Sequence, residues 1–264
     1  MMNKRFFLIF FIIVSMVVTP IFGMKKRDKK KAPKNTLLTL VLGDITRQEF
    51  DDPETSAVVN AANERLIGGA GVAQVIQLAA GPDLMTALRA IKTQVVHGQE
   101  IRRNVGGTKT TPSFNMSQRK DKTRVDWIIH AVGPDLSGII NRSLSGEIQR
   151  KYKKEFLRVA YRNSLWKALK HDIKTIAFPA ISTNIFGYDI EQATPEALGA
   201  IISFIKEHDD FEEIRFVAYN DRVYDCYRKF LGYRVDTGVL EEQKPVGKNP
   251  RPERTYKIVE QLFV

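Results

Sequence analysis

Short apolar runs alternate with longer amphipathic stretches along this chain, and the alternation restricts the fold more than any other feature. The apolar runs are rich in β-branched residues and lie at 36–43, 56–62, 125–133, 174–181 and 212–219. Helical spacing covers roughly 72–96, with an interruption at Gly81–Pro82, then 147–170, and stretches that start at Thr194 and Asp221. Such alternation predicts a sheet covered by helices on both faces.

Composition supports one domain with a sizeable core, because the chain has 264 residues of which 43% are hydrophobic. The single cysteine, Cys226, excludes an internal disulfide, and Cys/His metal clusters need more ligands. We therefore expect no metal and no cofactor. Cys226 lies in a helical stretch and is expected to be a packed thiol.

The first 23 residues have the layout of a signal peptide: a basic start, an apolar run from 6 to 18, then Pro20 and Gly23. The run is short for a spanning helix, which needs roughly 20 residues. Positive charge at 25–31 opposes export, however, and favours retention in the cytoplasm. A cleaved export signal, an uncleaved membrane anchor and a plain apolar arm all stay open, so we expect an exported or membrane-associated protein, with a cytoplasmic one as the alternative. Residues 24–35 are expected to be a flexible basic linker.

The net charge of +11 suggests nucleic acid as a partner, but its distribution does not. Residues 1–35 contain nine Lys or Arg and one Asp, a net charge of +8. The basic character therefore belongs to the leader, and we do not expect the domain to bind nucleic acid. Binding of nucleic acid or a membrane surface through the leader remains an alternative.

Glycines are concentrated in the segment Leu66–Gly81, "LIGGAGVAQVIQLAAG", which follows an apolar run and opens a helical one. Backbone N–H groups at a helix start are unpaired, and glycine lets a ligand approach them closely, so this loop predicts a phosphate site. A plain flexible loop is the alternative. The loop is not a dinucleotide motif, because Gln74 stands at the third glycine position, and 106–111 lacks the P-loop spacing.

Five short segments occur in the order and spacing of a known family. They are "LVLGDIT" (40–46), "VVNAAN" (58–63), "LIGGAGVA" (66–73), "IIHAVGP" (128–134) and "FPAISTNIFGYDIEQA" (178–193). Together they resemble a macrodomain, the ADP-ribose-binding family, over residues 36–232. The resemblance implies an α/β fold, a three-layer α/β/α sandwich around a mixed, roughly six-stranded sheet. Residues 233–264 then form a C-terminal extension, which we expect to be loose.

The resemblance also implies roles for individual residues. Asp44 would accept a hydrogen bond from the adenine amino group, with Ile45 in contact beside it. Asn63 would hold the distal ribose, and it is the candidate catalytic residue. The other implied ligand contacts belong to two phosphate-binding loops and to the end of the last strand: Gly68, Gly69, Ala70, Gly71 and Val72; Ser182, Thr183, Asn184, Ile185 and Phe186; Tyr219 and Asn220.

Three residues depart from the family pattern. Ala70 and Asn184 stand where glycine is usual, and Ala73 stands where one hydrolytic branch has an aspartate. Alanine cannot accept a proton, so two functions stay open. One is a hydrolase that removes mono-ADP-ribose or opens acyl-ADP-ribose esters, with a water held by the α-phosphate. The other is a non-catalytic reader of ADP-ribose or ADP-ribosylated protein.

Two polar residues in these segments are expected to be structural rather than functional. His130 lies at the end of an apolar run, where a hydrogen-bonded core histidine is the expectation. Asn60 is expected to bond neighbouring backbone.

Overall fold

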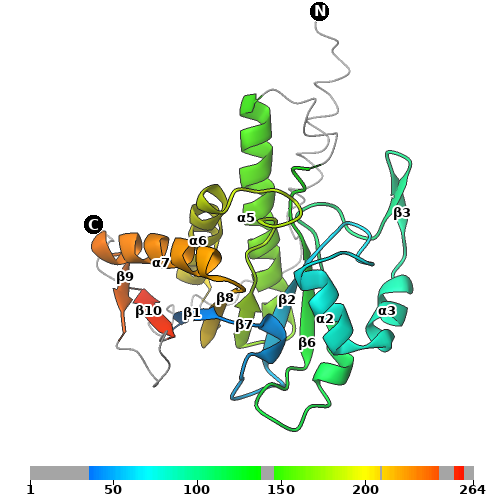
Figure 1. Cartoon of the computed structure of the whole chain (residues 1–264), viewed down its shortest axis with the longest axis horizontal. Coiled ribbons are helices and arrows are strands. Elements are labelled where there is room, and N and C mark those ends of the chain that lie inside the picture. Colours follow the sequence, from blue (N-terminus) through cyan, green and yellow to red (C-terminus); the bar gives the residue numbers. More distant parts are fainter. Residues whose placement is uncertain (1–35, 138–145, 209, 244–252, 259–264) are drawn as a thin grey trace, which may run out of the picture. The chain divides into compact units, whose positions relative to one another are not determined.

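A computed structural model describes residues 36–137, 146–208, 210–243 and 253–258. The expected leader and basic linker lie outside these residues, as do parts of the tail. Within the described residues, one mixed sheet carries helices on both faces, which confirms the three-layer α/β/α sandwich (Figure 1).

The strands of the main sheet are β1 (Leu37–Leu42), β2 (Ser56–Ala62), β5 (Thr108–Pro112), β6 (Trp127–Val132), β7 (Thr175–Phe178), β8 (Glu213–Ala218), β9 (Leu240–Glu242) and β10 (Arg254–Ile258). The helices are α2 (Val72–Ala80), α3 (Pro82–Arg89), α5 (Gly146–Lys170), α6 (Ile190–Glu207) and α7 (Asp221–Asp236), with short 3-10 turns η1 (Ile45–Arg47) and η2 (Phe114–Met116). A separate hairpin joins β3 (Gln94–Val96) to β4 (Gln99–Ile101).

The main sheet has the order β5-β6-β2-β7-β8-β1-β10-β9. Its five central strands, from β6 to β1, pair in parallel, whereas β5, β10 and β9 pair antiparallel with their neighbours. All five predicted apolar runs form these parallel strands. Because parallel neighbours share one direction, the loops that follow β2, β7 and β8 emerge at the same edge of the sheet.

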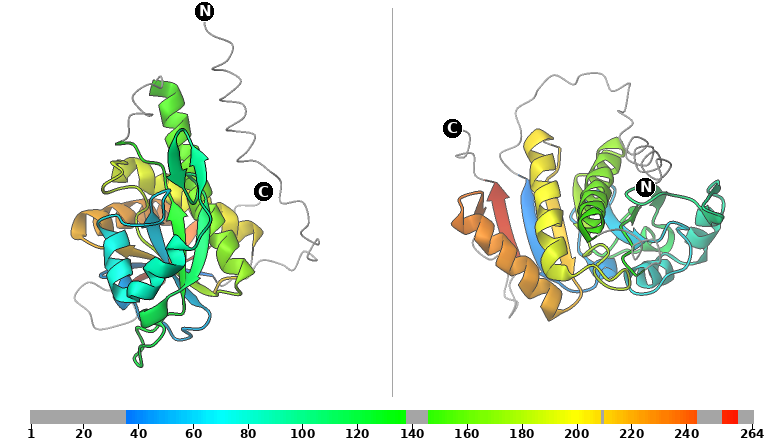
Figure 2. Two further views of the ribbon diagram at one scale, coloured as in Figure 1. Left: turned by 90° about the vertical axis from the view of Figure 1, so that its right-hand side faces the viewer. Right: turned by 90° about the horizontal axis from the view of Figure 1, so that it is seen from above.

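The two faces of the sheet bury separate cores. Along β2, Ala57 and Val59 belong to the cluster packed under α5, α6 and α7, while Val58 and Ala62 belong to the cluster under α2 and α3. Figure 2 shows α5, α6 and α7 in a row on one side. β2 is therefore buried on both faces, as its short apolar sequence predicts.

The expectation of a loose tail is wrong for the described part of the extension. Strand β10 pairs with β1, and β9 pairs with β10, so the sheet has eight strands rather than about six. Tyr256 anchors this addition with only 1% of its surface exposed. Helix α7 also runs past the expected boundary, to Asp236.

Two expected helices have different bounds. The stretch 72–96 ends as helix at Arg89, and its last residues form strand β3, which turns back through His97 and Gly98 at positive φ. Helix α6 starts at Ile190 instead of Thr194, because the Asp189 side chain accepts a hydrogen bond from the Gln192 amide at 3.2 Å. In the part of the chain that the structure describes, no helix is both long and apolar enough to span a bilayer.

Candidate functional site

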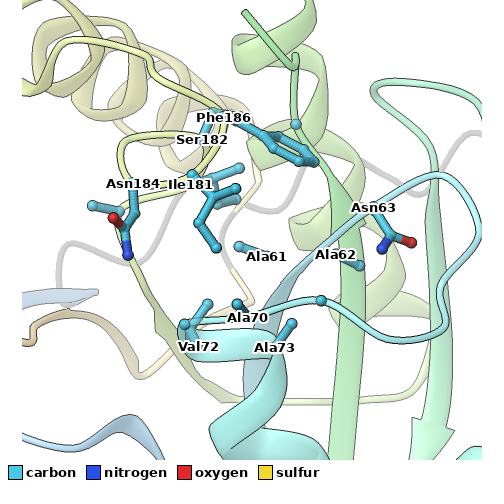
Figure 3. Close-up of a pocket in the computed structure, with 15 residues that line it drawn as sticks. Ala61, Ala62, Asn63, Ala70, Val72, Ala73, Ile181, Ser182, Asn184 and Phe186 are labelled. Carbon is cyan, nitrogen blue, oxygen red and sulfur yellow. The ribbon is translucent and has the colours of Figure 1, made fainter. Parts of the chain in front are cut away.

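A cavity of about 210 Å³ lies where the loops after β2 and β7 meet, at the carboxyl edge of the sheet (Figure 3). The loop after β2 passes from Asn63 to Gly71, and the loop after β7 passes from Pro179 to Asp189. The wall consists of small and apolar residues with a few polar ones: Ala61, Ala62, Asn63, Gly69, Ala70, Gly71, Val72, Ala73, Gly133, Ala180, Ile181, Ser182, Asn184, Ile185 and Phe186.

The glycine-rich loop takes a conformation that side chains rarely permit. Gly68, Gly69 and Gly71 have φ values of 68°, 112° and 62°, and Gly71 is the N-cap of α2. Ala70 is not among the residues with positive φ, so alanine replaces the usual glycine there without backbone strain. The Gln77 side-chain amide donates to the Gly68 carbonyl at 3.0 Å and ties the loop to α2.

The second loop is held by backbone bonds at both ends. The Tyr188 amide donates to the Ser182 carbonyl at 2.9 Å, and the Leu136 amide donates to the Phe186 carbonyl at 2.8 Å. In this loop Ser182 has φ of 67°, whereas Asn184 is not at positive φ. Asparagine is therefore accommodated at position 184 without any need for the left-handed region.

Two buried polar atoms on the cavity wall have no hydrogen-bond partner among the described residues. The Asn63 amide donates through Nδ2 to the Ile67 carbonyl at 3.2 Å, but its Oδ1 accepts nothing. The Ser182 hydroxyl is likewise unpaired, although the residue is only 5% exposed. An unpaired buried polar group costs about 1–3 kcal/mol, so a ligand that pairs with these two atoms recovers that cost.

A second pocket of about 390 Å³ adjoins the first and lies within the size range of small-molecule sites. Its wall is formed by Gly43, Asp44, Ile45, Gly71, Val72, Val75, Pro179, Ala180, Asn184, Val217 and Tyr219. Gly71, Val72, Ala180 and Asn184 belong to both walls, so the two pockets are chambers of one cleft. Asn184 is exposed at their junction.

Asp44 is the one charged residue in either wall, and no lysine or arginine contributes to them. Its Oδ1 accepts hydrogen bonds from the Thr46 amide at 2.8 Å and the Thr46 hydroxyl at 2.9 Å. Asp44 thus fixes the turn after β1 and also borders the second chamber. An anion bound in this cleft would rely on backbone N–H groups rather than on cationic side chains.

Most of the predicted site residues come together in the cleft, but three do not line it. A Cβ atom built on Gly68 would have no atom within 4 Å. The Thr183 hydroxyl donates to the Ala180 carbonyl at 2.9 Å. Asn220 instead caps α7, where its Oδ1 accepts from the Val223 amide at 3.0 Å. Tyr219, by contrast, lines the second chamber and is 60% exposed.

Sequence reasoning missed the small residues of the wall. Gly133 is the clearest case, because a Cβ at this position would overlap the Ser182 hydroxyl and lie 2.5 Å from Ile181 Cγ2. Only glycine lets the segment after β6 pack against the second loop. The sequence pattern that could have identified Gly133 is its position directly after an apolar strand.

His130 is a hydrogen-bonded core histidine, as expected. It is fully buried, with Nδ1 accepting from the Asn60 amide and Nε2 donating to the Thr111 hydroxyl, both at 3.0 Å. Burial lowers the pKa of His130 to about 3, so the ring is neutral. Asn60 is structural too, but it bonds this ring rather than backbone.

Cys226 and clusters of metal-ligating residues are two candidates for a second site among the described residues. Cys226 is buried beside Thr194, and burial raises the pKa of its thiol. No group of three or more His, Cys, Asp or Glu in the described ranges is arranged to hold a metal ion.

A mixed sheet with helices on both faces and a glycine-lined cleft at its carboxyl edge defines an α/β protein with a candidate binding cleft, and comparison with known proteins specifies the family. Residues 59–197 match the family model described as Macro domain. A macro domain-containing protein of Chlorobaculum tepidum is 35% identical over 75% of this chain and 98% of its own length. The chain belongs to the macro domain family.

Named relatives and solved structures extend the comparison. The O-acetyl-ADP-ribose deacetylase of Salmonella typhimurium is 35% identical over 75% of this chain and 96% of its own. The Oceanobacillus iheyensis macrodomain with ADP is similar at a TM-score of 0.62 and 32% identity, covering 80% of this chain and 97% of that one. The Trypanosoma brucei macrodomain in complex with ADP-ribose has a TM-score of 0.57 and 27% identity, covering 74% and 69%.

Proposed function

We propose that this protein binds ADP-ribose in the two-chambered cleft and hydrolyses acyl esters of its distal ribose. The observation that carries the proposal is the pair of unpaired buried atoms, Asn63 Oδ1 and Ser182 Oγ, in a cavity closed by two facing turns. A ligand with hydroxyl and phosphate groups would satisfy both.

The orientation of the ligand follows from the chemistry of the chambers. The diphosphate lies at the junction, where the start of α2 and the second loop offer backbone amides. The adenine occupies the second chamber, with its amino group donating to Asp44 and its ring against Tyr219. The distal ribose lies in the first chamber beside Asn63 and Phe186.

Hydrolysis requires a proton acceptor that the wall of the first chamber does not provide, since Ala73 stands where an aspartate would. A phosphate oxygen of the ligand can take this part. A water bonded to that oxygen attacks the acyl carbonyl carbon and gives its proton to the phosphate. The bond between the acyl carbon and the ribose oxygen then breaks, the acyl group leaves as the carboxylic acid, and the ribose oxygen takes the proton back from the phosphate. Asn63 would hold the sugar in position for this attack.

The test is to measure acetate release from O-acetyl-ADP-ribose, with binding of ADP-ribose measured by calorimetry in parallel. The wild type should release acetate and Asn63→Ala should not, while Asn104→Ala, an exposed amide outside the cleft, should behave as wild type. If the wild type and Asn63→Ala release acetate equally slowly but still bind ADP-ribose, the protein is a non-catalytic reader. If the wild type does not bind ADP-ribose, both the hydrolase and the reader are refuted.

We also propose that residues 1–23 direct the protein to a membrane, as a cleaved export signal or as an anchor. The support is the apolar run between basic flanks. Sequencing the N-terminus of the mature protein tests it: a start at Met24 indicates cleavage after Gly23. An intact N-terminus in a protein recovered from the cytosol would contradict the proposal.

A further inference from the structure

Strand β5 is the last strand at its side of the main sheet, and a groove of about 460 Å³ runs along it. The groove is distinct from the cleft, because none of its residues lines either chamber. Its wall comes from the end of α3, the loop before β5 and the strand itself: Ala87, Ala90, Ile91, Lys92, Arg103, Lys109, Thr110, Thr111 and Pro112.

Positive charge gathers at this groove without compensation. Lys92, Arg103 and Lys109 line it, and none of them forms an ion pair within the described ranges. Lys167 and Lys170 on α5 add to the same field: burial first, and then the charges of Lys170, Lys109 and Arg103, lower the pKa of Lys167. No Asp or Glu lines the groove, so its wall has a positive potential.

The backbone of β5 offers hydrogen bonds on its outer side. The Val132 amide donates to the Gly107 carbonyl, and the Ser113 amide donates to the Asp126 carbonyl. The backbone N–H and C=O groups of the odd-numbered residues in this segment therefore point toward β6. Alternation then directs the N–H and C=O groups of Thr110 away from β6. The Thr110 hydroxyl is buried and has no partner among the described residues.

The other residues of the groove favour a peptide over a nucleic acid. Ala87, Ala90 and Ile91 give an aliphatic surface, and no aromatic side chain lines the groove for bases to stack on. An extended peptide, by contrast, can use both the donor and the acceptor of Thr110 and direct alternate side chains to either wall.

We propose that the outer edge of β5 is a docking groove for an extended acidic segment of a partner protein, which adds to the sheet as a strand and places carboxylates against Lys92 and Lys109. This proposal does not depend on ADP-ribose binding. Lysines on an edge strand can instead serve only to prevent the edge from pairing with the sheet of another molecule. The experiment below distinguishes this protective role from peptide docking.

The experiment measures fluorescence anisotropy of a labelled peptide of alternating glutamate and valine with the full-length chain at low salt. We expect saturable binding that weakens as salt rises and is unaffected by saturating ADP-ribose. Lys92→Glu combined with Lys109→Glu should weaken binding by about tenfold or more, since both substitutions reverse charge at residues that line the groove. Lys151→Glu combined with Lys229→Glu changes the net charge by the same amount at exposed lysines outside the groove, and this control should bind as wild type does.

A second probe tests strand addition without altering the protein. The same peptide with N-methyl groups on alternate residues keeps its charge but loses backbone donors, and one of its two registers should bind much more weakly than the unmodified peptide. Equal binding by both methylated registers would overturn strand addition. Absence of acidic-peptide binding, an unchanged affinity in the double lysine variant, or tighter binding of a single-stranded oligonucleotide would overturn the docking proposal.

Discussion

Gly71 and Asn184 face each other across the cleft, and a Cβ atom at position 71 would lie 3.3 Å from Nδ2 of Asn184. A side chain at position 71 would therefore press against Asn184. Both residues line both chambers, so this close approach of the two loops lies at the junction of the chambers.

Gly71→Glu should abolish ADP-ribose binding, because the new side chain adds bulk and negative charge where the proposed binding mode puts the phosphates. Gly71 has φ of 62° and ψ of −134°, a backbone conformation that side chains rarely adopt, so we also expect a loss of about 1–3 kcal/mol in unfolding free energy for any side chain there. Gly98→Glu is the control, since Gly98 has φ of 76° in the distant β3–β4 hairpin. Calorimetry and urea unfolding should show similar destabilisation in both variants and loss of binding in one. Wild-type affinity in Gly71→Glu would place the phosphates elsewhere.

Asp44→Ala should weaken ADP-ribose binding by about 1–3 kcal/mol, the range for losing a hydrogen bond to a charged acceptor. Asp44→Asn should preserve more stability, because an amide oxygen can still accept from the Thr46 amide. Titrations with ADP-ribose and with its inosine analogue, which lacks the adenine amino group, isolate the contact. If Asp44→Ala weakens both ligands equally, Asp44 does not read the amino group.

Ser182→Ala should separate stability from binding. Serine already has φ of 67°, so alanine adds no new backbone strain, and it removes a buried hydroxyl without a partner. We expect the unfolding free energy of the free protein to stay level or rise by about 1 kcal/mol, while ADP-ribose affinity falls by about 0.5–1.5 kcal/mol. Thermal melts with and without ligand measure both. A large loss of stability without ligand would mean that the hydroxyl is paired in solution.

Protonation of His130 should contribute to acid unfolding. Its pKa falls from 6.5 to about 3 on folding, so the unfolded chain takes up this proton first as the pH drops. The stabilisation from a neutral ring is complete above about pH 6.5 and is lost progressively toward pH 3, at no more than about 1.4 kcal/mol per pH unit. His130→Gln should be less stable at neutral pH but show a shallower pH dependence. Parallel stability curves for the wild type and His130→Gln would contradict the assignment.

Tyr256→Ala should cost about 3–5 kcal/mol of unfolding free energy, the usual cost of truncating a buried aromatic residue. The side chain is 1% exposed and belongs to the core under α7. Tyr256→Phe retains the ring and should cost far less. Urea unfolding of the three proteins checks that the extension is part of the folded domain. A cost below about 1 kcal/mol for Tyr256→Ala would indicate that β10 detaches in solution.

Sequence reasoning located the parallel strands because both of their faces are buried, and burial leaves a continuous apolar run such as "SAVVNAA". It missed β5 and β10, whose sequences "TKTTP" and "RTYKI" are polar. Strands at or near the edge of a sheet can carry polar side chains, so their pairing depends on tertiary contacts that no local pattern records.

For the cleft, resemblance supplied the residues that a ligand would touch, and physical reasoning identified the glycine loop. Neither approach identified the wall residues Ala61, Ala62 and Gly133, because these residues have no polar or charged group that would indicate a binding role. The resemblance also placed Asn220 in the site. Its polar side chain follows a strand end, but a helix N-cap requires the same residue type at the same place.

The order in which the sheet is assembled has a consequence for biosynthesis. β1 is the first described strand to leave the ribosome, yet its two hydrogen-bonded neighbours are β8 and β10, at the far end of the described sequence. The nascent chain must therefore keep Leu38 and Leu40 without strand partners until almost the whole domain has been translated. Folding of this domain is therefore delayed by its own connectivity until its last strands have been synthesised.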